Sequence, residues 1–456
     1  MIKMTYRQKV RKITRIALPS GANSLLDIIV MALGMLFMGH FGQEHIVAVS
    51  IAMQFMMMFF AINAVFYIGT NAQISRFYGA RDSNAASMVF STLFLLCGFC
   101  GIPIVCLAYL GSDGFISWFD LSEKSNILTK QFLSIAIFSL PPMLLKNIIT
   151  AAFAAMGNTL SIFIVRIFST IFCVACNYFL IFEVKVEILG EIYQLGAGLG
   201  IIGAALASTI TSYVELGLFA LLALKKGKFF IQRFGIFWKY FYIALKIGIP
   251  TGIERFLTLG SLVLTTRLIA SFGDIAVAGS QIGSRIESFA FMPGFGFMVA
   301  AMALTGQNLG ANRVWLAEDL NKTILQISSV VMGILGIFMA VFAVPLSAIF
   351  YDDIAVIEVA KWYLWAVGLS QVPLIWVFVL DGVLRGAGIT NRSLVINAIS
   401  IWGFRIAPMW IGIECGLGIW WVFVLIFVET YIRAGLFYIV YARGSWKRAG
   451  KEFFTS

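Results

Sequence analysis

Ionisable residues stand inside long apolar stretches of this sequence, where a charge is costly and therefore suggests a role. Burial in a medium of low dielectric constant favours the uncharged form of a carboxyl group, so such a group can take up a proton near neutral pH. Its oxygens can also hold Na⁺. The residues are six carboxylates and seven bases: Asp27, Glu215, Glu254, Glu287, Asp381 and Glu429, with Lys146, Arg166, Arg255, Arg267, Arg285, Arg405 and Arg433.

Glu254 and Thr258 are four residues apart, which places them on one face of a helix. A carboxylate and a hydroxyl at this spacing form an oxygen-rich position suited to H⁺ or Na⁺. An ion pair of Glu254 with Arg267 or Arg405 is the structural alternative.

Three further acids are candidates for the same role. Asp381 precedes Arg385 by four residues, the spacing of an intrahelical ion pair, so it is either functional or structural. Asp27 lies near the middle of the first apolar segment and either binds a cation or makes buried hydrogen bonds. Glu287 lies near the middle of the eighth predicted span and either has a functional role or pairs with Arg285 or Arg405.

The remaining buried charges favour a structural role. Glu429 and Arg433 share the four-residue spacing and are expected to form an ion pair. Lys146 and Arg166 are expected to balance Glu215 or to bind backbone carbonyls.

The segment MQFMMMFF contains Met53, Met56 and Met57. Flexible thioether side chains adapt to varied apolar ligands, so these residues are candidates for a substrate-binding surface. At helical spacing the run also points towards several sides, and packing against lipid or protein is the alternative.

The elements that must position these residues are membrane helices. The chain has 456 residues, of which 60% are hydrophobic and 12% charged, and its mean hydropathy is +0.93. Soluble domains carry about twice that charged fraction. Since one span needs about 20 apolar residues, twelve spans account for the length. The predicted spans are 15–39, 46–72, 86–110, 129–156, 160–182, 201–224, 243–271, 276–303, 322–350, 361–387, 393–413 and 417–441.

The net charge of +11 does not indicate a nucleic-acid partner. Most Lys and Arg residues fall at the termini and in alternate loops, which is the positive-inside pattern. We therefore expect an integral protein of the plasma (inner) membrane with both termini in the cytoplasm. The expected partners are membrane lipids and a small organic molecule, with no nucleic acid and no obligatory protein partner.

The sequence repeats itself at an offset of 231 residues. Each unit holds six spans, an even number, so the two copies are parallel and related by an axis along the membrane normal. We predict an all-α integral membrane protein with twelve transmembrane helices in two parallel six-helix repeats, forming two lobes around a central cleft. The predicted lobes are 1–224 and 243–456, joined by a cytoplasmic linker at 225–242. The aligned pairs include Arg15 with Lys246, Pro19 with Pro250, Gly79 with Gly310, and Gly157 with Gly388.

Several motifs resemble those of the multidrug and toxic compound extrusion (MATE) transporters. They are ALPSG and SRFYGARD in the first half, and SQIGSRIESFAFMPGFGF, TGQNLGANR and LRGAGIT in the second. The resemblance covers essentially the whole chain. It implies export of cationic, amphiphilic organic compounds in exchange for Na⁺ or H⁺.

The chain departs from the pattern of this family at three positions. The Asp that usually precedes the end of the first span by five residues is Gly34 here. The polar pair of the fifth span is Cys173 and Asn177, which leaves Asn177 as a candidate for the substrate-binding surface. The position eight residues after the Pro of the seventh span, a Glu in some members, is Thr258.

These observations favour a secondary antiporter over an enzyme. We expect H⁺ or Na⁺ to bind chiefly Glu254 and Asp381, and no cofactor or metal other than this coupling ion. The sequence carries no GxxxxGK[ST] motif for ATP and no nucleophile–base or metal constellation. The alternative is a flippase for a lipid-linked oligosaccharide or another amphiphile, whose cleft would carry several Arg or Lys.

Overall fold

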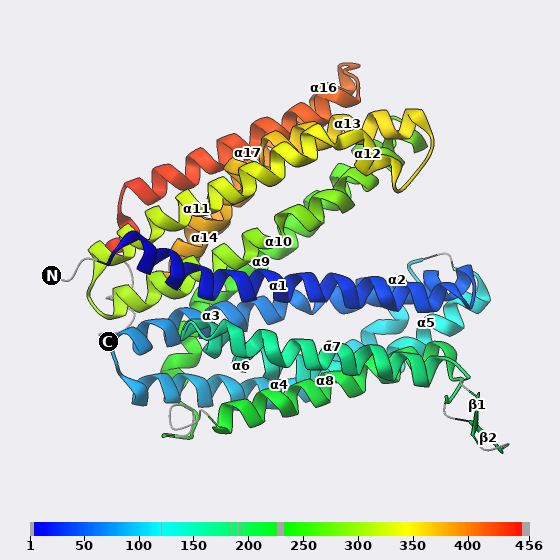
Figure 1. Ribbon diagram of the computed structural model, residues 1–456, viewed down its shortest axis with the longest axis horizontal. Coiled ribbons are helices and arrows are strands. Elements are labelled where there is room, and N and C mark those ends of the chain that lie inside the picture. The colour runs from blue at the N-terminus through cyan, green and yellow to red at the C-terminus, as the bar shows by residue number, and fades with distance from the viewer. Residues whose placement is uncertain are drawn as a thin grey trace.

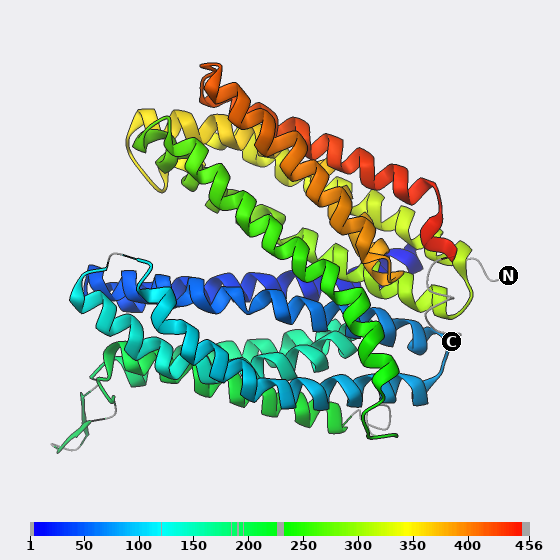
Figure 2. The same ribbon diagram turned by 180° about the vertical axis from the view of Figure 1, so that it is seen from behind.

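The computed structural model describes residues 4–119, 121–183, 185–188, 191–194, 196–225 and 232–448. Its regular secondary structure in these ranges is helical apart from one antiparallel β-hairpin, β1 (Lys185–Ile188) and β2 (Glu191–Gln194). The helices form two bundles that meet at one end and diverge at the other, so the molecule has the outline of a V (Figure 1). Figure 2 shows the same arrangement from behind.

The first bundle, the N-lobe, is built from the helices of the first half. Its helical elements are α1 (Tyr6–Gly39), α2 (Gln43–Met58), α3 (Phe60–Gly79), α4 (Ser83–Ile116), α5 (Glu123–Ala136), η1 (Ile137–Ser139), α6 (Leu140–Ala155), α7 (Thr159–Ile181) and α8 (Gly200–Lys225).

The second bundle, the C-lobe, contains the helices of the second half and one π-helical segment, η2. Its elements are α9 (Trp238–Ala270), α10 (Asp274–Gly310), α11 (Val314–Val341), α12 (Ala343–Ala348), α13 (Ile354–Leu369), α14 (Gln371–Gly386), α15 (Thr390–Ala398), η2 (Ile399–Ile406), α16 (Ala407–Glu414), α17 (Ile419–Ala442) and α18 (Ser445–Arg448).

Twelve segments of the described chain are long and apolar enough to cross a membrane. Eleven are continuous or nearly straight, and the twelfth consists of α13 and α14, which meet at an angle of 51°. The predicted span 361–387 is therefore broken at Ser370. Pro373 lies three residues further on and lacks the backbone N–H that would bond to the Leu369 carbonyl in a continuous helix. The expected number of spans and the two-lobe architecture are confirmed.

The backbone carries the 231-residue repeat in its turns. Helices end at residues with positive φ, a conformation that costs little for Gly and is uncommon for other residues. The equivalent turns have nearly the same φ: Gly42 (107°) and Gly273 (95°), Arg81 (60°) and Asn312 (53°), and Gly157 (78°) and Gly388 (80°).

The two lobes touch at the end where α1 begins and α17 ends, which we call the closed end. Gly296 of α10 lies on Ala17 of α1, where an added Cβ would be 2.2 Å from the Ala17 carbonyl oxygen. The equivalent contact places Gly248 of α9 on Val65 of α3, at 2.1 Å from the carbonyl oxygen. Small residues thus let helices of opposite lobes approach closely.

Polar contacts also cross between the lobes at the closed end. The ammonium group of Lys9 lies 2.7 Å from a carboxylate oxygen of Asp319, and the Gln307 amide donates to the Ala155 carbonyl at 2.7 Å. The segment before α9 is fastened to α4, since the Thr92 hydroxyl accepts a hydrogen bond from the Phe237 N–H at 3.0 Å. Of the predicted linker 225–242, residues 226–231 lie outside the described chain.

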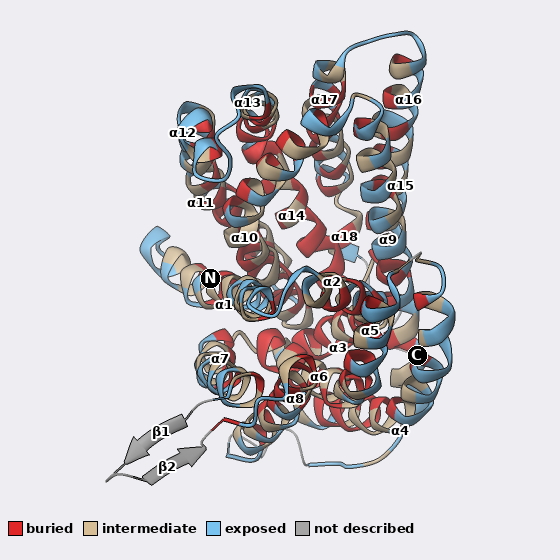
Figure 3. Ribbon diagram, turned by 90° about the vertical axis from the view of Figure 1, so that its right-hand side faces the viewer, coloured by how far each residue is buried: buried red, intermediate tan, exposed pale blue. Residues whose placement is uncertain are grey.

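The surfaces that face each other across the V belong to few helices. Seen from the divergent end, α1 and α2 lie on the side of the N-lobe nearest the C-lobe, and α9 and α10 on the side of the C-lobe nearest the N-lobe (Figure 3). Three of these helices carry acids described next, namely Asp27 on α1, Glu254 on α9 and Glu287 on α10.

Candidate functional site

Glu254 and Asp381 are brought together by one guanidinium group in the C-lobe. Arg385 Nη2 lies 2.9 Å from Glu254 Oε1 and 3.1 Å from Oε2, and its Nε donates to Asp381 Oδ2 at 2.7 Å. The side chains of Arg385 and Asp381 are each only 7% exposed, and that of Glu254 is 13% exposed. This buried trio joins α9 to α14.

The trio contains two acids and one base. Three of the four carboxylate oxygens bind Arg385, whereas Asp381 Oδ1 is buried and has no hydrogen-bond partner among the described residues. A buried carboxylate oxygen without a partner is costly, and a proton or a cation relieves that cost.

A second buried cluster of the C-lobe has the opposite balance of charge. Glu429 lies between Arg405, which donates to it from Nη2, and Arg433, whose Nε is 3.1 Å away, and it also accepts a hydrogen bond from Ser400 at 2.7 Å. The predicted pair of Glu429 and Arg433 is therefore formed. Arg433 is also close enough to interact electrostatically with Glu254 and Asp381.

The other C-lobe candidates lie outside the trio. Glu287 Oε2 accepts a hydrogen bond from the Tyr363 hydroxyl at 2.7 Å, and neither Arg285 nor Arg405 forms an ion pair with it. Thr258 is exposed, and its hydroxyl donates to the Glu254 backbone carbonyl at 2.8 Å instead of facing the Glu254 carboxylate.

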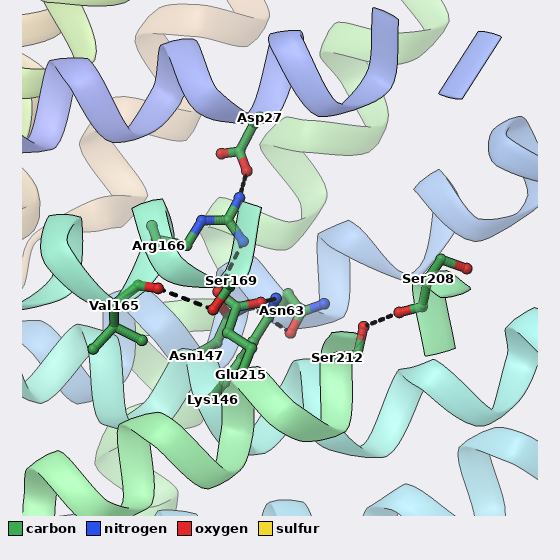
Figure 4. Close-up of polar contacts among 10 residues, drawn as sticks. All are labelled: Asp27, Asn63, Lys146, Asn147, Val165, Arg166, Ser169, Ser208, Ser212 and Glu215. Atoms are coloured by element: carbon green, nitrogen blue, oxygen red, sulfur yellow. Dashed lines mark hydrogen bonds and ion pairs between the residues drawn. The ribbon is translucent and has the colours of Figure 1, made fainter. Parts of the chain in front are cut away.

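The N-lobe contains a chain of four charged residues, shown in Figure 4. Lys146 of α6 and Arg166 of α7 bind opposite oxygens of Glu215 at 2.6 and 2.8 Å, and Arg166 also pairs with Asp27 of α1. Glu215 is buried, with 3% of its side chain exposed, whereas Asp27 is 59% exposed. The expected balance of Glu215 by Lys146 and Arg166 is formed, and Asp27 lies at the accessible end of the network.

The apolar candidates do not form one group. Met53 and Met56 are partly buried against the N-lobe core, and Met57 is 42% exposed. The amide of Asn177 donates to the Cys173 carbonyl of its own helix at 2.8 Å. Among the described residues, no group of three His, Cys, Asp or Glu side chains has the arrangement of a metal site.

From the sequence, Arg385 was expected to pair only with Asp381, and Glu254 with Arg267 or Arg405. Arg385 and Glu254 are 131 residues apart in the sequence, so local residue spacing could not predict their contact. The only signal for it was the general one, namely that charges within membrane spans seek partners.

The fold and its buried charges define a two-lobed polytopic membrane transporter. The family model described as MatE matches residues 19–179 and 250–411, two stretches that correspond to the two repeats. The chain belongs to the MatE family of multidrug efflux transporters.

The chain is similar over nearly its whole length to curated relatives. It is 25% identical to the probable multidrug resistance protein NorM of Thermotoga maritima, over 96% of this chain and 93% of that protein. It is 23% identical to the protein of the same name from Neisseria meningitidis serogroup B, over 88% and 87% of the two chains.

Solved structures share the fold. The Vibrio cholerae MATE transporter VcmN in the bent form superposes with a TM-score of 0.89 at 20% identity, covering 98% of this chain and 99% of that one. A MOP superfamily transporter from Pyrococcus furiosus gives a TM-score of 0.86 at 18% identity, covering 98% and 100%.

Proposed function

We propose that this protein is a secondary active antiporter that exports cationic or amphiphilic organic compounds in exchange for H⁺ or Na⁺. The names of the NorM relatives as multidrug resistance proteins support export of organic compounds. The observation that carries the coupling role is the buried trio in which Glu254 and Asp381 share Arg385.

Among the described residues, Arg385 is the only base that pairs directly with either acid, and it leaves one carboxylate oxygen without a donor, so the trio can accept a proton or a cation at that oxygen. Only Asp381 Oδ1 is without a partner, and a proton needs a single oxygen whereas Na⁺ needs several. The geometry therefore favours H⁺ over Na⁺.

Protonation of the trio acts on the contact between the lobes. A neutral Asp381 binds the Nε of Arg385 less strongly, so the guanidinium group is held mainly by Glu254 and the contact between α14 and α9 changes. Glu254 stands two residues beyond Gly252, and Gly252 packs on Val65 of the opposite lobe. A change in how α9 is held thus reaches the surface on which the lobes must rock.

One or two ions are sufficient to drive export. A single charge moving across about 100 mV releases about 2.3 kcal/mol, which sustains a gradient of roughly fiftyfold at about 1.4 kcal/mol per factor of ten. In this mechanism 1–224 and 243–456 move as two bodies joined by 225–242. In this mechanism the protein spans the plasma membrane, and its basic loops and both termini lie on the cytoplasmic side.

Ethidium efflux from proteoliposomes tests the proposal, with a pH gradient and a Na⁺ gradient imposed in separate experiments. We expect transport with the pH gradient, and loss of the gradient-driven component in Glu254→Gln combined with Asp381→Asn. The control combines Asp352→Asn with Glu358→Gln, two exposed acids of the C-lobe. Wild-type transport by the first pair of substitutions would exclude the trio as the coupling site.

A further inference from the structure

Arg255 of α9 and Arg285 of α10 are two arginines within membrane spans that have no acidic partner. Both are exposed, and neither forms a hydrogen bond or ion pair with any side chain in the described ranges. By contrast, Arg166, Arg385 and Arg405 all bind carboxylates. An arginine at the centre of a span costs about 2.5–3.5 kcal/mol in lipid, so these two must face water or a ligand.

The packing of α9 shows where Arg255 points. Gly248 and Gly252 of α9 lie on α3 of the opposite lobe. Arg255 follows Gly248 by seven residues, which is two helical turns, and therefore lies on the same face of the helix. Its side chain is directed towards the N-lobe, about 10 Å beyond the point where the lobes touch.

The packing of α10 places Arg285 in the same way. The position of Gly21 in α1 is bounded by Met292 and Pro293, where an added Cβ would be 3.4 Å from the Pro293 Cα. Arg285 precedes Met292 by seven residues and therefore shares the face that meets α1. Both arginines thus project from the C-lobe towards the N-lobe.

The two guanidinium groups lie at similar depths. The contacts of Gly248 with Val65 and of Gly296 with Ala17 are equivalent in the two repeats and so mark one level. Arg255 is seven residues beyond that level and Arg285 eleven, a difference of about 6 Å at about 1.5 Å per residue. Figure 3 shows α9 and α10 together on the side of the C-lobe that faces α1 and α2.

The acids near these arginines are already engaged. Arg255 interacts electrostatically with Glu254 and Asp381 but, within the described chain, forms no ion pair with either acid. Both oxygens of Glu254 are held by Arg385, and Asp381 binds Arg385 through Oδ2. Glu287 is directed to Tyr363.

The opposite wall is neutral at the equivalent positions. Ser24 and Gln54 stand 231 residues before Arg255 and Arg285, and Asp27 of the same wall is paired with Arg166. The surface between the lobes therefore has an excess of positive charge on the C-lobe side.

Apolar side chains share the faces of the two arginines. Leu259 is 41% exposed one turn beyond Arg255, and Phe289 is 52% exposed one turn from Arg285. On the N-lobe side, Met58 of α2 is 45% exposed. The surface thus combines two guanidinium groups with an apolar, adaptable lining.

We propose that Arg255 and Arg285 bind an anionic group of the transported amphiphile, a carboxylate or a phosphate, while its apolar body lies on the lining between the lobes. Guanidinium groups bind both kinds of anion through paired hydrogen bonds. That the bound amphiphile is also transported rests on the proposed function. The binding of its anionic group does not depend on that function. Substrates that carry a negative group, including zwitterions, would bind to these two arginines. Purely cationic compounds would bind without them.

Equilibrium binding to the purified full-length protein tests the proposal with two pairs of probes. Norfloxacin carries a carboxylate that its ethyl ester lacks, and farnesyl pyrophosphate carries a phosphate group that farnesol lacks. We expect the anionic member of at least one pair to bind about tenfold more tightly, as one charge-assisted contact provides. The pair that shows the preference distinguishes a soluble carboxylate from a lipid phosphate.

Arg255→Gln combined with Arg285→Gln is expected to remove the preference for the anionic member of the pair. The affinity for the uncharged or esterified member should stay within about twofold of the wild-type value. This unchanged affinity would also show that the variant is folded. Arg267→Gln is the matched control, because Arg267 is an exposed arginine of α9 about 80° away from the face of Gly248 and Gly252. Equal binding within both pairs, or a preference that persists in the double variant, overturns the proposal. No ion gradient is present, so this result is independent of whether Glu254 and Asp381 couple transport.

Discussion

Gly79 of α3 and Gly310 of α10 occupy equivalent positions in the two repeats, and each lies against the backbone of the opposite helix. An added Cβ on Gly79 would be 1.9 Å from the Gln307 carbonyl oxygen, and one on Gly310 would be 1.9 Å from the Arg76 carbonyl oxygen. The closed end is thus held by two equivalent contacts, one in each repeat. Only glycine fits at either position. The conformation described here depends on them.

Gly79→Ala is expected to part the lobes at the closed end, because the added methyl group meets backbone that cannot move aside on its own. Spin labels at Asn84 and Lys322, which are exposed residues of opposite lobes, should report a longer distance in this variant by double electron–electron resonance. Gly34→Ala is the control, since nothing lies within 4 Å of its added Cβ. An unchanged distance distribution in Gly79→Ala would contradict the role of this contact.

Arg385→Gln should be strongly destabilising, because it leaves Glu254 and Asp381 buried without their shared base. Loss of one partner of a buried ion pair costs about 3–5 kcal/mol. The free energy of unfolding can be measured by SDS titration in mixed micelles. Adding Glu254→Gln and Asp381→Asn to Arg385→Gln should restore part of the loss. No recovery would mean that Arg385 stabilises the fold by packing and not by charge.

The N-lobe network predicts unequal effects for its two acids. Glu215→Gln leaves Lys146 and Arg166 without their buried partner, and we expect a loss of about 3–5 kcal/mol in the free energy of unfolding. Asp27→Asn should cost about 0–1 kcal/mol, because Asp27 is largely exposed and water replaces the lost contact. The same titration compares the two variants, and similar losses would contradict the burial described here.

Tyr363→Phe removes the hydrogen bond that Glu287 accepts within the C-lobe. A buried polar group that loses its partner costs about 1–3 kcal/mol, which should appear as a lower melting temperature by tryptophan fluorescence. Tyr431→Phe serves for comparison. The hydroxyl of Tyr431 donates a hydrogen bond to the Leu369 carbonyl, but the Tyr431 side chain is exposed. If both variants melt together with the wild type, the Glu287 contact contributes nothing measurable.

Much of the fold could be predicted because its signals are local or periodic. Apolar runs of about 20 residues predict membrane spans independently of the tertiary contacts that these spans make. The 231-residue offset aligned Gly157 with Gly388, and both residues have a positive φ at equivalent turns. The break between α13 and α14 was not predicted, because the apolar run continues through Ser370 and Pro373 alone does not fix where a helix bends.

The candidate site was predicted as a set of residues and not as an arrangement. Four-residue spacing was enough for Asp381 with Arg385 and for Glu429 with Arg433, because one helical turn fixes those distances. The pairing of Glu254 with Arg385, by contrast, spans 131 residues. Helix periodicity says nothing about which helix stands opposite.

The amino-acid sequence by itself determined that the chain lies in a membrane, that it is written twice, and which side chains would be costly there, because each of these follows from composition, periodicity and the short reach of a helical turn. Only the tertiary structure decided that Arg385 is shared by two acids and that Arg255 and Arg285 face the opposite lobe without partners. Those relations depend on how helices cross, and the crossings are set by small residues such as Gly248 and Gly296 at contacts far apart in the sequence.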